Sequence, residues 1–136
     1  MDLHPPRSTG ESRALDVSDG QQVGYASFNK GGYEIHAGLW SGTARSWVDL
    51  HPTGAEYSTA YGVSHGYQAG IARLSDGLNH AGMWSGTRES WVDLHALLPA
   101  DYLSSCANDI QVTDTDIWVV GEADGRAVLW HKRLSQ

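Results

Sequence analysis

The sequence is poor in cysteine and in basic residues, which argues against disulfide bonds within the chain and against a nucleic-acid partner. Cys106 is the only cysteine, so no disulfide can form within the chain and packing alone must hold the fold together. Nine Lys and Arg residues stand against sixteen Asp and Glu residues, which gives a formal net charge of −7. Phosphate backbones require clustered positive charge, so we expect no nucleic-acid partner.

Long apolar runs are also absent. No stretch approaches the ~18 residues that cross a bilayer, and no charged segment followed by an apolar one resembles a secretion signal. We therefore expect no membrane partner and a soluble, cytoplasmic protein, or an extracellular one if the chain is a processed or trimmed form. With 136 residues, 40% of them apolar and 18% charged, the composition predicts one globular domain.

The sequence has an internal repeat instead. Residues 36–52 read HAGLWSGTARSWVDLHP, and residues 80–96 read HAGMWSGTRESWVDLHA. Trp40 and Trp84 mark the same position in these two copies, and Trp130 marks it in a degenerate third copy. The chain is therefore a single repeat domain, 1–136, of three units. The units span roughly 6–52, 53–96 and 97–136.

Each unit carries short alternating or β-rich segments separated by glycine and polar turns, which is typical of strands. In the second unit they read STAYGVS, YQAGIARL, HAGMW and SWVDLH. No window shows the apolar spacing of a capped helix, and HALLPADYLSS predicts one helical turn at most. The sequence predicts an all-β fold of twelve strands in three four-stranded units.

The third unit lacks the segment for its fourth strand, and the first residues of the chain carry that sequence. Asp2-Leu3-His4-Pro5 repeats residues 49–52 without change. Because an unpaired sheet edge invites aggregation, we expect residues 1–5 to supply the closing strand.

These residues resemble the HAF-type repeats of bacterial extracellular proteins. SRALDVSDGQQVG, HAGLW and WVDLHP carry the resemblance, which spans essentially the whole chain, although Gly38 and Gly82 stand where that family often has Phe. The resemblance implies β-propeller-like blades. Three blades are too few for a ring, so we expect a homodimeric six-bladed propeller in which MDLHPP of one chain completes the last blade of the other. The alternative is a monomeric threefold β-trefoil or β-prism.

Motifs for catalysis and metal binding are weak. Residues 62–66 form a literal G-x-S-x-G, but strand-like sequence follows and the first unit reads DVSDG there, so we expect a turn between strands. His4, His51 and His95 share one repeated position, and we assign them to turn hydrogen bonds rather than to zinc. We expect no enzymatic activity, no cofactor and no metal.

Four aromatic residues are the candidates for ligand binding. Trp47 and Trp91 recur in two units only, so they are less essential to the core and could serve as platforms on which sugar rings stack; the alternative is ordinary half-buried packing. Tyr57 and Tyr61 lie where the units differ, as does the loop at 29–33, and variable loops on a repeated scaffold often carry recognition.

The sequence therefore predicts a non-enzymatic binding module with lectin-like recognition of carbohydrate or another exposed surface. Repeated sites would raise the avidity well above the affinity of one site. The alternative is a protein–protein interaction scaffold of unknown partner that uses a flat acidic face.

Overall fold

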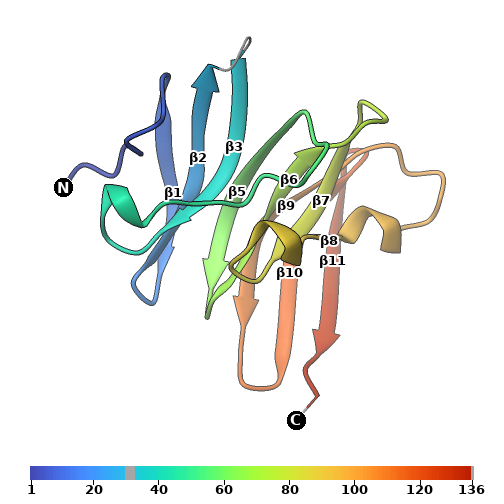
Figure 1. Ribbon diagram of the computed structural model, residues 1–136. Helices are drawn as coiled ribbons and strands as arrows, with labels where there is room; N and C mark the ends of the chain where they lie inside the picture. The colour runs from blue at the N-terminus through green and yellow to red at the C-terminus, as the bar shows by residue number, and fades with distance from the viewer. Residues whose placement is uncertain (30–32, 136) are drawn as a thin grey trace.

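The computed structural model describes residues 1–29 and 33–135 and contains three antiparallel sheets in chain order (Figure 1). The first sheet comprises β1 (Ser12–Ser18), β2 (Gln21–Asn29), β3 (Tyr33–Trp40) and β4 (Val48–Asp49). The second comprises β5 (Tyr57–Ser64), β6 (Tyr67–Arg73), β7 (Asn79–Trp84) and β8 (Val92–Asp93). The third comprises β9 (Ser105–Val112), β10 (Asp116–Ala123) and β11 (Arg126–Arg133).

The all-β class is confirmed, with one strand fewer than the twelve expected. Residues 1–5 form no strand, so the third sheet has three strands and β11 lies at its edge. The only helices in the described ranges are short 3-10 turns, none long and apolar enough to cross a bilayer. They are η1 (Ala44–Ser46), η2 (Arg88–Ser90) and η3 (Leu94–Leu97).

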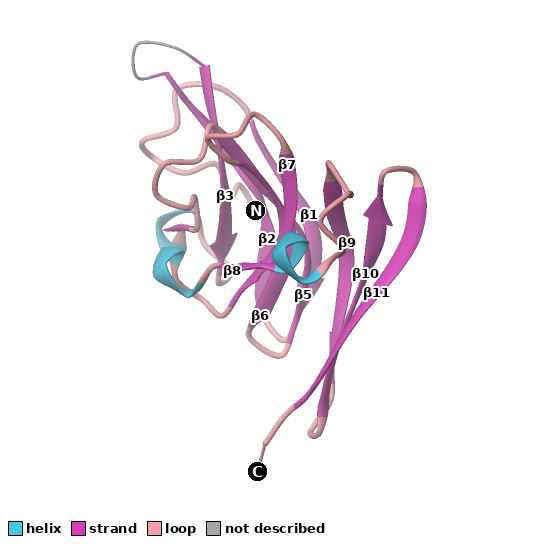
Figure 2. Cartoon of the chain, turned by 90° about the vertical axis from the view of Figure 1, so that its right-hand side faces the viewer, coloured by secondary structure: helices cyan, strands magenta, loops and turns pink. Residues whose placement is uncertain are grey.

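The sheets stack face to face. The first strand of the second sheet, β5, packs against β1, β2 and β3, and β9 packs in the same way against the second sheet. Figures 1 and 2 show the first and third sheets at the two ends of the stack, with the second between them. Among the described residues no sheet closes on itself.

Each sheet has a tight hairpin turn and a bulge. Two-residue turns with positive φ at both residues join the first and second strands of the first two sheets, at Asp19-Gly20 and His65-Gly66, and the second and third strands of the third sheet, at Asp124-Gly125. This is the type I′ geometry that matches the twist of a hairpin. One residue of each first strand is also bulged out of the pairing register. The bulged residues are Leu15, Tyr61 and Asn108.

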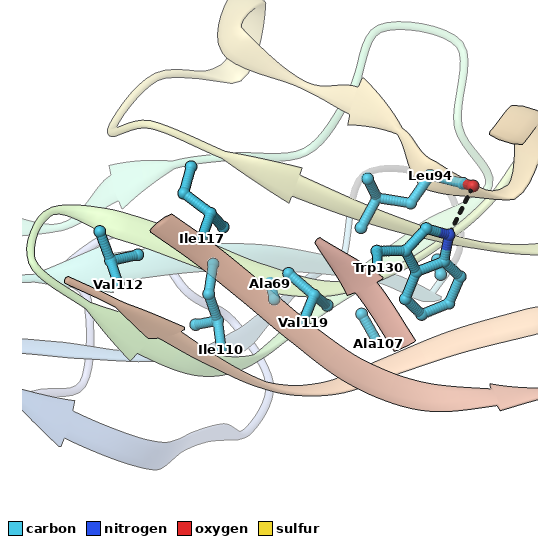
Figure 3. Close-up of a cluster of buried hydrophobic side chains, with 9 residues drawn as sticks. Ala69, Leu94, Ala107, Ile110, Val112, Ile117, Val119 and Trp130 are labelled. Carbon is cyan, nitrogen blue, oxygen red and sulfur yellow. Dashed lines mark hydrogen bonds between the residues drawn. The ribbon is translucent and has the colours of Figure 1, made fainter. Parts of the chain in front are cut away.

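Two apolar clusters lie between the sheets. The cluster between the first and second sheets includes Val23, Leu39 and Val63, and Figure 3 shows the cluster between the second and third sheets. Trp130 belongs to the second cluster, and its Nε1–H donates to the carbonyl of Leu94 at 3.0 Å. This bond ties the last strand to the preceding sheet.

The other two repeated tryptophans differ from Trp130. Trp40 and Trp84 are almost fully buried, as expected for core positions between sheets. No hydrogen-bond partner for their Nε1–H groups lies among the described residues. We therefore attribute the stabilisation at these positions to the apolar surface of the ring.

Candidate functional site

The outer edge of the first sheet contains a cavity of about 530 Å³. Its walls come from the segment before β1, from the end of β2, from β3 and from the η1–β4 region. The side chains that give it chemical character are two aromatic, two basic and two further titratable ones: Phe28, Trp47, Arg7, Arg45, His36 and Asp49.

Trp47 is held in this cavity wall by its own sheet. It follows η1 and packs its ring directly on Gly38, where an added Cβ would lie 2.0 Å from the ring. The ring also contacts Trp40, with centroids 4.8 Å apart, and Phe28, with centroids 6.2 Å apart. Trp47 is therefore half-buried: part of the ring stabilises the sheet and part lines the cavity.

Trp91 repeats this packing but does not line this cavity. Its ring lies on Gly82 in the same way and packs against the cluster between the first and second sheets. The second unit has Arg88 where the first has Ala44, and the Arg88 guanidinium lies 3.2 Å from the Asp49 carboxylate. The long Arg88 side chain of the second unit thus reaches Asp49 of the first sheet, whereas the equivalent Ala44 has only a short side chain.

Tyr57 and Tyr61 do not line the cavity with Trp47. The Tyr57 hydroxyl donates to Asn79 Oδ1 at 2.7 Å, and the Arg73 guanidinium lies 5.4 Å from the centre of its ring. Tyr61 is the bulged residue of β5, and burial together with nearby Cys106 raises its pKa. The structure therefore does not bring the four candidate aromatic residues into one site. Residues 30–32 of the candidate loop lie outside the described residues.

His36 is clamped between two carboxylates at the cavity edge. Its Nδ1 lies 2.7 Å from Asp49 Oδ2 and its Nε2 lies 3.1 Å from Glu34 Oε2. Burial disfavours the charged ring, but the hydrogen bonds and charges of Asp49 and Glu34 outweigh it and raise the pKa of His36. A doubly protonated imidazole can donate to both carboxylates at once.

The same clamp recurs at His80, and the sequence reasoning did not predict the carboxylate partners of these two histidines. The ring nitrogens of His80 lie 2.9 Å from Asp93 and 2.8 Å from Asp76, and its pKa is also raised despite burial. A signal was present: His36 and Asp49 are thirteen positions apart, as are His80 and Asp93. In both units this pair joins the third strand to the fourth.

His51 has the turn-stabilising role expected from the sequence. Its ring stacks on His36 at a centroid distance of 3.9 Å. The bond pattern assigns Nε2–H as donor to the Ala55 carbonyl, while Nδ1 accepts from Ser58 Oγ, which in turn accepts from the Ala37 N–H. Burial and the charge of His36 lower the pKa of His51.

The histidine clamps predict a pH dependence of stability. Because the pKa values of His36 and His80 are raised in the folded protein, their stabilisation is complete below the ordinary histidine pKa and is lost as pH rises through the folded values. We expect the melting temperature to fall by about 2–5 °C over that range. The double variant His36→Gln/His80→Gln should lose this decline in a calorimetric pH series, and an unchanged decline would contradict the assignment.

The remaining sequence candidates have structural roles. Ser64 of the G-x-S-x-G motif is buried, accepts from the Val112 N–H at 3.0 Å and precedes a turn between strands. Burial and the charge of Glu122 raise the pKa of the Cys106 thiol to about 11, so the thiolate is scarce at neutral pH. Within the described ranges, no group of three or more His, Cys, Asp or Glu side chains is placed to hold a metal ion.

The chain was compared with protein-family models, with curated proteins and with solved structures, and none of them matches. The geometry of its own residues is therefore the basis for a proposed function.

Proposed function

We propose that this chain is a non-enzymatic binding module that recognises carbohydrate, in a lectin-like manner, at the cavity beside Trp47. The observation that carries the proposal is the composition of this cavity: half-buried aromatic rings next to exposed polar and charged groups. Aromatic faces pack against the C–H faces of sugars, while Asp49 and the two arginines are suited to bind hydroxyls. A concave site with an apolar wall and a few polar groups is the usual form of a small-ligand site.

The charge of the cavity favours a sugar with an acidic substituent. Arg7 and Arg45 are exposed, and neither makes an ion pair within the described part of the chain. In a chain with a net charge of −7, two unpaired guanidinium groups at one cavity form a local basic site. Guanidinium groups bind carboxylates in a planar, bidentate geometry.

The scaffold in this proposal is a ring of propeller-like blades of the HAF type. Each sheet is one blade, and two copies of the chain form a six-bladed homodimer. The stacking of sheets in chain order, with both ends of the stack open, supports this arrangement over a monomeric β-trefoil or β-prism. Two cavities per dimer would raise the avidity for a surface that displays many glycans.

The experiment is a glycan-array screen followed by calorimetric titration of Trp47→Ala and Trp91→Ala. The two tryptophans have equivalent packing, so Trp91→Ala is a matched control for lost stability. We expect Trp47→Ala to weaken binding at least about tenfold through loss of the stacking surface. Trp91→Ala should change it by less than about twofold.

Two results would contradict this assignment. Equal losses in both variants would place the effect in the folding of the scaffold rather than in the cavity. An array without any bound glycan, acidic sugars included, would favour the protein–protein interaction scaffold instead.

A further inference from the structure

The two ends of the sheet stack expose residues whose equivalents are buried or half-buried at the internal junctions. Val63 and Ile110 are 3% and 6% exposed, whereas Val17, at the same position of the first sheet, is 65% exposed. On the opposite face, Leu39 is 3% exposed and the equivalent Leu129 of the third sheet is 58% exposed. At the internal junctions, the third-strand face of one sheet covers the first-strand valine or isoleucine of the next sheet. The exposed face of the third sheet, around Leu129, could therefore cover the exposed face of the first sheet, around Val17.

The third sheet also has space for a fourth strand beside its edge strand β11. A cavity of about 540 Å³, lined by Leu94, Leu129 and Trp130 among others, lies beside β11. Where Gly38 and Gly82 make room for a tryptophan ring from the fourth strand, the third sheet has Val128. Residues 2–5 repeat the Asp-Leu-His-Pro sequence that includes the fourth-strand aspartate Asp49.

Residues 2–5 already have the geometry of a fourth-strand end. The His4 N–H donates to Asp2 Oδ1 at 2.8 Å, as the His51 N–H donates to Asp49 Oδ1. His4 Nδ1 lies 2.8 Å from Ser12 Oγ, the contact that the equivalent residues make at both internal junctions. The segment is thus held against the first sheet, with no third strand of its own chain beside it.

Backbone groups complete the match. At both internal junctions the N–H of a third-strand alanine donates to the first serine of the next sheet, Ala37 to Ser58 and Ala81 to Ser105, each at 2.9 Å. Ala127 and Ser12 are the equivalent pair, at opposite ends of the stack. Ser12 Oγ can therefore accept from the Ala127 N–H of another copy, and the Leu3 N–H can donate to the Ala127 carbonyl, as the Leu50 N–H donates to Ala37.

The charges at this junction are complementary as well. In the first two sheets a histidine on the third strand pairs with the aspartate of the fourth, His36 with Asp49 and His80 with Asp93. The third sheet has Arg126 at the histidine position and Asp2 is the equivalent aspartate. Arginine is charged at every physiological pH, so this pair does not depend on a raised histidine pKa.

We infer that residues 2–5 of one copy form the fourth strand of the third sheet of a second copy, beside β11, with Asp2 paired to Arg126. The inference rests on the six-bladed ring proposed above and names the contacts that close it. In a two-fold ring both junctions are of this kind, so each copy gives one strand and receives one. The Pro5–Arg7 wall of the Trp47 cavity follows the exchanged strand directly, so dimerisation also fixes one side of that cavity.

Charge reversal and mixing test the inference on the full chain. In Asp2→Arg homodimers two arginines meet at both junctions, and in Arg126→Asp homodimers two aspartates meet. We expect each variant to dimerise about 100-fold more weakly than the unmodified protein. In an equimolar mixture, both junctions of the mixed dimer pair an arginine with an aspartate, so the two variants should associate with near-original affinity.

Arg133→Asp, with the same charge change on the same strand, should dimerise like the unmodified protein, and thermal melting of all variants reports intact folding. Single variants that dimerise normally, or a mixture that stays monomeric, would overturn the exchanged strand. If the exchanged strand is overturned in this way but the unmodified protein is a dimer, the ring must be closed by other contacts. The experiment therefore distinguishes an incorrect strand exchange from an incorrect ring. If a monomer binds glycan, the proposed function of the cavity stands even though the strand exchange and the ring are wrong.

Discussion

Replacing Gly70 with alanine is expected to lower the free energy of unfolding by at least about 3 kcal/mol or to prevent folding altogether. An alanine Cβ at this position would lie 2.0 Å from the carbonyl oxygen of Thr59 and 2.9 Å from the Cα of Ala60. Both atoms belong to the backbone of β5 next to its bulge, so no side-chain rotation relieves the overlap. The measurement is chemical denaturation followed by tryptophan fluorescence.

Gly77→Ala is the control for this variant. Gly77 has a φ of +77° but an added Cβ would meet no atom within 4 Å. Backbone strain alone should cost about 1 kcal/mol there. Equal losses for Gly70→Ala and Gly77→Ala would show that the close approach of β6 to the bulge of β5 is not what stabilises the sheet.

The second large effect is expected at Ser58. This residue is fully buried, and its hydroxyl accepts from the Ala37 N–H of the first sheet while it bonds His51. Ser58→Ala removes the partner of the buried Ala37 N–H and one partner of the half-buried His51 ring at the junction between the sheets. We expect the free energy of unfolding to fall by about 2–4 kcal/mol, since each buried group left unsatisfied costs about 1–3 kcal/mol.

Ser12→Ala is the matched control, because Ser12 is the same residue of the repeat at the open end of the stack. It bonds His4 but no N–H of a preceding sheet in its own chain, so its loss should cost less than about 1 kcal/mol when it is measured in the Arg126→Asp background at concentrations where that variant is monomeric. If Ser12→Ala destabilises the monomer as much as Ser58→Ala does, the serine acts within its own turn rather than across the junction.

The all-β class and the division into three sheets could be predicted from the repeat. The near-identity of the copies around Trp40 and Trp84 indicated repeated units, and strand and turn patterns predicted the all-β class, which the structure confirms. The sequence alone predicted twelve strands, whereas the described residues form eleven. The twelfth was expected from residues 1–5, which in one chain lie at the end of the stack opposite to the edge strand β11 (Figure 1).

The candidate site was less predictable, because it depends on differences between repeats rather than on the repeat. Trp47 and Trp91 look equivalent in the sequence, but the residues near them differ. Ala44 lines the cavity beside Trp47, whereas its equivalent in the second unit, Arg88, extends to Asp49 of the first sheet. That contact joins two neighbouring sheets, and nothing in the spacing within one unit reveals it.

The native mass in solution tests the central claim most directly. Light scattering across a concentration range, with one chain at 14.8 kDa, should give a stable mass of twice that value, because the two open ends of one stack complement those of a second copy. A single-chain mass at every concentration would contradict the ring and leave both exposed faces, around Val17 and Leu129, without the partner proposed for them.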